Sequence, residues 1–71
     1  MKLYTQDRSK VTELPKEIWV TSYGVQFAII GTLYTMPVIA LYDTEQRAKA
    51  VLKEIFEHYR NGKNSYVLPE R

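Results

Sequence analysis

The stretch that decides the fold runs from Phe27 to Tyr59 and reads FAIIGTLYTMPVIALYDTEQRAKAVLKEIFEHY. Its apolar pattern changes at the corner Tyr42-Asp43-Thr44. Before the corner the stretch is rich in β-branched and aromatic residues, which favour strands. After it, apolar residues recur at the spacing of one helix face, namely Ala48, Val51, Leu52, Ile55, Phe56 and Tyr59. The stretch therefore predicts strands followed by one amphipathic α-helix.

The helix is predicted to run from about Thr44 to Asn61. Asp43 is expected to cap its N-terminus, with Gln46 at the distance of a capping box. Gly62 is expected to take the left-handed conformation that ends many helices, because glycine adopts it without a steric penalty.

Working outward, the composition predicts short strands separated by turn residues, at Lys2–Gln6, Val11–Leu14, Glu17–Tyr23, Val25–Thr35 and Val38–Tyr42. Gly24 and Met36-Pro37 are the predicted turns, and Gly31 suggests a bulge or a close backbone approach. The predicted fold class is α+β. It is an antiparallel β-meander of four to five short strands, with one C-terminal amphipathic α-helix packed on one face. Residues 1–71 are expected to form a single domain, with 63–71 as an extended tail or an edge strand.

One apolar face of the meander should be covered by the helix. Alternation within the strand assigns Phe27, Ile29 and Leu33 to that face. Leu52, Ile55 and Phe56 are expected to pack against them.

Size and composition exclude several classes of function. The chain has 71 residues, no cysteine and one histidine, so it has no disulfide or thiolate metal site, and a zinc site is disfavoured. No cofactor is expected. A domain this small is marginally stable alone, and we expect it to gain stability by forming a homo-oligomer.

Catalytic groups are not gathered by any motif, and the chain is expected not to be an enzyme. His58 lies one helical turn after Glu54, so a surface contact explains it. The three glycines are isolated and form no phosphate-binding loop. No apolar run is long enough for a signal peptide or a membrane span, so a cytoplasmic location is expected.

The open face of the sheet is the predicted working surface. If Ile18 and Val20 point inward, then Trp19, Tyr23, Ile30 and Tyr34 lie on the face without a helix. Aromatic residues there are suited to binding. Arg8, Lys10 and Lys16 are the predicted rim charges. A slip of one residue would exchange the faces and place Trp19 in the core, and the sequence leaves both alternatives open.

The segments MKLYTQD, LPKEIWV, LYDTEQRAKAVLKEIFEHY and YVLPER together resemble a group of small uncharacterised proteins of phages and prophages of Gram-positive bacteria. The shared features are an early Gln6-Asp7, a Y-x-[ST]-E-x-x-A helix entry at Tyr42–Ala48, and the ending Leu68-Pro69-Glu70. The resemblance implies an accessory protein of a mobile element in the host cytoplasm. It also implies antagonism of host defence, and it assigns no functional residue.

Two functions remain open. The first is a non-enzymatic binding protein of a phage or mobile element, which binds a host protein or sequesters a small anionic ligand such as a signalling nucleotide. The alternative is a small nucleic-acid-binding module that stacks bases on the sheet-face aromatics. The net charge of +2 disfavours the alternative, because nucleic-acid binders usually carry a concentrated basic surface.

Overall fold

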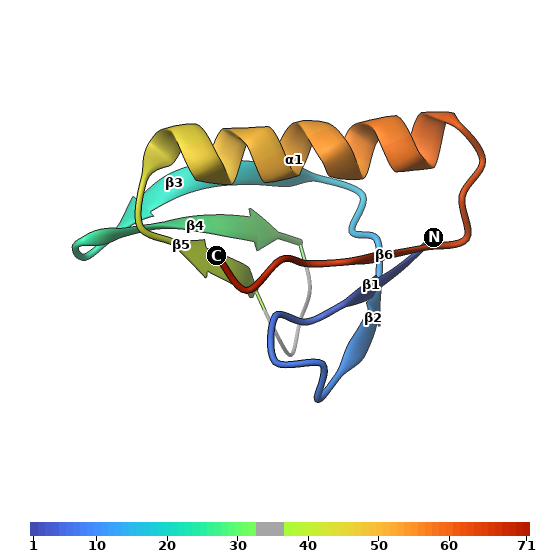
Figure 1. The fold of residues 1–71 in the computed structure, drawn as a ribbon, viewed down its shortest axis with the longest axis horizontal. Coiled ribbons are helices and arrows are strands. Elements are labelled where there is room, and N and C mark those ends of the chain that lie inside the picture. Colours follow the sequence, from blue (N-terminus) through green and yellow to red (C-terminus); the bar gives the residue numbers. More distant parts are fainter. Residues whose placement is uncertain (33–36) are drawn as a thin grey trace.

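The computed structural model describes residues 1–32 and 37–71. In these residues the chain forms an α+β fold, which confirms the predicted class. The elements are β1 (Lys2–Tyr4), β2 (Val11–Glu13), β3 (Ile18–Tyr23), β4 (Gln26–Gly31), β5 (Val38–Tyr42), α1 (Glu45–Arg60) and β6 (Ser65–Val67). Figure 1 shows α1 lying across one face of the sheet formed by β3, β4 and β5.

The strands form two sheets rather than the single meander that was predicted. One sheet has the order β3-β4-β5 and is antiparallel throughout. The other has the order β2-β1-β6, with β1 antiparallel to β2 and parallel to β6. The break falls between β2 and β3, where Pro15 cannot donate a ladder hydrogen bond. The C-terminal segment therefore returns as an edge strand beside the first strand of the chain.

The hairpin between β3 and β4 has a two-residue turn, Gly24-Val25, because Tyr23 pairs with Gln26. Gly24 has a φ of 66°, and glycine at the first central position is the signature of the tight turns that match strand twist. The turn fixes the register of the whole sheet. It thereby decides which residues of β3 face the helix.

The N-cap of the helix lies one residue later than predicted. Thr44, not Asp43, is the N-cap, since its hydroxyl accepts a hydrogen bond from the backbone N–H of Arg47. Gln46 therefore does not stand at the capping-box position. At the other end Gly62 has the predicted positive φ, 74°. The N–H groups of Gly62 and Lys63 bond back to carbonyls of the last turn, which completes a Schellman motif.

The core lies between α1 and the two sheets. Its buried residues are Leu3, Ile29, Ile39, Ala40, Tyr42, Ala48, Val51, Ile55, Tyr66 and Leu68. Ile18, Val20 and Phe27 pack against this cluster. The prediction for Phe56 was wrong, since its side chain is 59% exposed. Phe56 lies about 100° around the helix from buried Ile55, so it leaves the covered face. Leu33 lies outside the described residues.

The C-terminal segment is fixed by side chains from distant parts of the chain. The Gln6 amide donates to the carbonyls of Pro69 and Glu70, and the Tyr42 hydroxyl donates to Pro69 O at 2.8 Å. Burial raises the pKa of Tyr42 to about 12, so its phenol stays protonated and can donate. Among residues 1–32 and 37–71, no helix has both the length and the apolar character needed to cross a bilayer.

Candidate binding site

The face of the β3-β4-β5 sheet that points away from α1 carries mostly apolar side chains, with Thr21 and Gln26 among them. We call it the open sheet face, and its residues in register are Trp19, Thr21, Tyr23, Gln26, Ala28, Ile30, Val38 and Leu41. Trp19 is 43% exposed and Tyr23 is 51% exposed. Trp19 is thus placed opposite the helix, as the first of the two sequence alternatives expected.

The centre of the open sheet face is closed to water. Ala28 has 0% exposure although it points away from the helix, and its lateral neighbours are Thr21 and Leu41. The small methyl group is therefore covered by the larger side chains around it. The result is a compact platform rather than a set of separate side chains, and its two most exposed large residues are the aromatics of β3.

The predicted rim charges do not gather around these aromatics. Lys10 lines a hollow with Val38 and Leu41, at the β5 edge, while Trp19 and Tyr23 lie on β3 at the opposite edge. Two strand spacings, about 10 Å, separate these edges. Arg8 bonds to Glu70 at 3.1 Å. Lys16 lines a hollow with Ile18 and Tyr59 on the helix side. Tyr34 lies outside the described residues.

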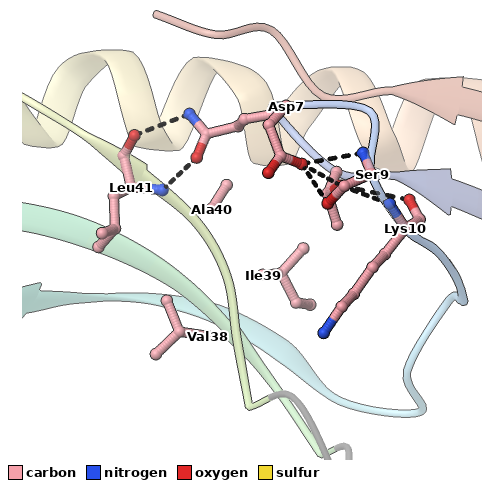
Figure 2. A pocket seen from close by; sticks show the side chains of 9 residues that line it. Asp7, Ser9, Lys10, Val38, Ile39, Ala40 and Leu41 are labelled. Atoms are coloured by element: carbon pink, nitrogen blue, oxygen red, sulfur yellow. Dashed lines mark hydrogen bonds between the residues drawn. The ribbon is translucent and has the colours of Figure 1, made fainter.

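The hollow beside β5 was not predicted from the sequence. It has a volume of about 370 Å³ and lies between β5 and the loop that joins β1 to β2. Figure 2 shows Asp7, Ser9 and Lys10 of this loop facing Ile39, Ala40 and Leu41. The Gln6 amide donates to the Leu41 carbonyl and accepts from the Leu41 N–H, both at 2.9 Å. A side chain thereby takes the place of a neighbouring strand at this edge.

Asp7 holds the loop in shape. Its carboxylate accepts hydrogen bonds from the Ser9 hydroxyl at 2.7 Å, the Ser9 N–H at 2.9 Å and the Thr5 hydroxyl at 2.9 Å. These bonds favour the charged form, and those from Ser9 contribute most. They lower the pKa of Asp7 from 3.8 to about 2.

This shift predicts a pH dependence of the loop. Because the folded-state pKa is below the unfolded one, the stabilisation by Asp7 is complete above about pH 4 and is lost as the pH falls toward 2. We expect the Asp7 carboxyl resonance to titrate near pH 2 by NMR. Ser9→Ala should raise that midpoint toward 3.8, whereas Ser22→Ala, a change at an exposed serine in β3, should not. An unchanged midpoint in Ser9→Ala would contradict the assignment of the cause.

Residues from the three sequence motifs named in the resemblance to phage proteins lie together in the fold. Gln6 bonds to Leu41 and to the carbonyls of Pro69 and Glu70, while Tyr42 bonds to Pro69. Asp7 shapes the loop that presents Gln6. These residues therefore have a structural role: they anchor the C-terminal segment against β5. Their pairing in space was missed because the partners lie more than 60 positions apart in two of these bonds.

The comparisons with known proteins return nothing to set beside this geometry. No protein-family model matches the chain, and neither the curated proteins nor the solved structures contain a significant match.

Proposed function

We propose that this is a non-enzymatic binding protein that holds a protein partner on the open sheet face. The main support is that Trp19 and Tyr23 are both exposed on β3. They lie on the same face as Ala28, which is fully covered by its neighbours. Trp and Tyr bury much apolar area while fixing few torsions, which is why they dominate binding hot spots. The resemblance to small phage and prophage proteins suggests that the protein comes from a phage or mobile element. Its partner would then be a host protein, such as a protein of host defence.

The arrangement of charges favours a protein partner over a nucleotide or a nucleic acid. The hollow that contains Lys10 also contains the Asp7 carboxylate, whose low pKa keeps it negative at neutral pH. A phosphate there would meet a fixed negative charge. Arg8 is engaged by Glu70, and neither Lys10 nor Lys16 lies beside the aromatics of β3. These three basic residues would therefore not supply phosphate contacts to bases stacked on β3.

The single histidine supports a binding role rather than a catalytic one. His58 Nδ1 lies 2.9 Å from the carbonyl of Glu54, and its ring packs edge-on against Tyr66 at a centroid distance of 4.7 Å. The ring is thus held by the helix and by β6. His58 belongs to α1 and lines neither the open sheet face nor the hollow beside β5.

The test is a comparison of partner capture by matched variants. Immobilised wild-type protein is exposed to lysate of a Gram-positive host, and bound proteins, nucleic acids and metabolites are identified. Trp19→Ala should weaken capture of the partner by at least about 30-fold, because a buried aromatic anchor of an interface contributes about 2 kcal/mol or more. Tyr4→Ala should retain the partner, since Tyr4 is an exposed aromatic on the other sheet.

Circular dichroism and light scattering accompany each variant. Equal capture by wild type and Trp19→Ala would contradict the proposal, as would recovery of nucleic acid that is released by salt. The homo-oligomer predicted from the chain length remains a prediction. If the open sheet face joins two copies instead, wild type should scatter as a dimer and Trp19→Ala as a monomer of 8.3 kDa.

A further inference from the structure

β3 forms one edge of the β3-β4-β5 sheet, and the backbone groups along its outer side have no hydrogen-bond partner within residues 1–32 and 37–71. The inner side is fixed by the Thr32 N–H, which donates to the Glu17 carbonyl at 3.1 Å. Alternate residues of an antiparallel strand bond to the same neighbour, so the odd-numbered residues of β3 also bond to β4. The N–H and C=O groups of the even-numbered residues therefore point away from the sheet, and these residues are Ile18, Val20 and Ser22.

Each of the other sheet edges in the described residues is protected in a way that β3 is not. β2 and β6 have three residues each, and Glu13 of β2 forms an ion pair with Lys2. At the β5 edge the Gln6 side chain bonds to both backbone groups of Leu41, and the pairing of β5 with β4 is irregular. β3 has six residues without a charge, a proline or a break in register. An edge of this kind is a template for another strand.

We infer that β3 pairs with β3 of a second copy of the chain, antiparallel and about a two-fold axis through Val20. The two three-stranded sheets then form one sheet of six strands. This inference does not rest on the binding function proposed above. The pairing uses the edge of the strand, and Trp19 and Tyr23 remain on the open sheet face of each copy.

This register satisfies every outward backbone group of β3. Ile18 lies opposite Ser22 of the other copy and Val20 lies opposite its own equivalent, so each N–H meets a carbonyl. A shift in register would leave some of these groups unpaired. The charged residues nearest to the strand are Lys16 and Glu17, which both precede it. Antiparallel pairing therefore places them at opposite ends in the two copies, and no like charges meet along the edge.

The same axis acts on the apolar side chains that α1 leaves in water. In Figure 1 α1 runs along β3. A hollow of about 440 Å³ beside them is lined by Ile18 of β3 and by Leu52, Phe56 and Tyr59 of α1, among others. Phe56 is 59% exposed and Tyr59 is 58% exposed. Rotation about an axis perpendicular to the sheet keeps both helices on one face, and the two flanks then face each other.

The charges of this helix flank are compatible with the contact. Lys49 and Lys53 line the hollow, Glu57 follows Lys53 by one turn, and Glu45 lies 3.6 Å from Lys49. Because the rotation reverses the direction of the second helix, the flanks meet with charges of both signs. An extended segment of another protein would satisfy only the backbone groups of β3. A second copy supplies a strand edge and an apolar helix flank together.

The test is amide hydrogen exchange of the full chain, followed by NMR at a high and at a low protein concentration. In a monomer the amides of Val20 and Ser22 point into water and exchange fast. At the high concentration we expect at least about tenfold slower exchange at both, because the dimer holds them in hydrogen bonds. The Thr21 amide, which bonds to β4, should be protected at both concentrations. Light scattering should give twice the monomer mass of 8.3 kDa at the high concentration.

Two variants at one exposed residue form a matched pair. Ser22→Pro removes an outward N–H without breaking a bond to β4, and it should scatter as a monomer. Ser22→Ala keeps the N–H and should remain a dimer. Trp19→Ala should also remain a dimer, which separates the strand edge from the open sheet face. Circular dichroism checks the fold of each variant, and the exchange experiment on wild type decides the question without any substitution.

Three results would overturn the proposal: a monomer at every concentration, fast exchange of the Val20 amide in the dimer, or a folded Ser22→Pro that still dimerises. A dimer that Trp19→Ala dissociates, with the amides of Val20 and Ser22 exchanging fast, would assign the contact to the open sheet face instead.

Discussion

Ile55→Ala should lower the free energy of unfolding by about 2–5 kcal/mol. Ile55 is 2% exposed and lies in the buried stripe of α1 beside Val51, at the centre of the core. The change removes apolar contacts and leaves a cavity that the surrounding sheet residues fill only in part. A domain of this size has little stability in reserve, so most of the folded population should be lost on mild heating. Thermal and urea melts followed by circular dichroism measure the effect.

Two neighbouring positions on the same helix serve as controls. Lys53 is exposed, and Lys53→Ala should change the free energy of unfolding by less than about 0.5 kcal/mol. Leu52 is half-buried in a hollow that Leu14 and Ile18 also line, so the loss of stability in Leu52→Ala should fall between those of the other two variants. A melt of Ile55→Ala that coincides with wild type would show that α1 does not pack on the sheets as described.

Gly31→Ala should destabilise the fold by about 1–3 kcal/mol, the range for an overpacked core. A Cβ atom at Gly31 would meet the Pro15 ring and would lie 2.9 Å from Cδ1 of Ile39. Gly31 is not among the glycines with positive φ, so its backbone would accept alanine. Replacing a glycine at such a position ordinarily stabilises a protein by lowering the entropy of the unfolded chain. The sign of the measured change therefore reports the close approach of Pro15.

The double variant with Pro15→Ala isolates that contact. Removing the proline ring should reduce the cost of Gly31→Ala, because the ring supplies the shortest contacts of the added methyl group. Urea denaturation of wild type, both single variants and the double variant completes the cycle. Strictly additive effects, or a stabilising Gly31→Ala, would refute this account of the glycine.

Several features of the fold could be predicted because local chemistry controls them. The β5 strand at Val38–Tyr42 and the turn at Gly24 were predicted at the observed positions, since alternation and glycine conformation are encoded in short stretches. The N-cap was misplaced by one residue. Asp43 and Thr44 are both good caps, and the backbone path into the helix decides between them.

The candidate site was predicted less completely. Alternation placed Trp19 and Tyr23 on one face, but the pattern alone could not say which face the helix covers. Arg8, Lys10 and Lys16 are near in sequence, yet the fold sends them to different sides. The exposure of Phe56 was not predicted, because Phe56 fits the apolar period of α1. The signal that could have found it is the width of that stripe, which exceeds what the covered face accommodates.

The sequence by itself determined the local elements of this protein: the helix and its Gly62 ending, the tight turn at Gly24, and the apolar alternation of β3 and β4. These depend on backbone preferences and on periodicity over a few residues. Only the tertiary structure decided how those elements combine. It paired β6 with β1, joined Gln6 to Leu41 and Pro69, and left Phe56 and Tyr59 in water. The physical reason is that these contacts join residues far apart in the chain, and their formation depends on how the two sheets and the helix share one small core.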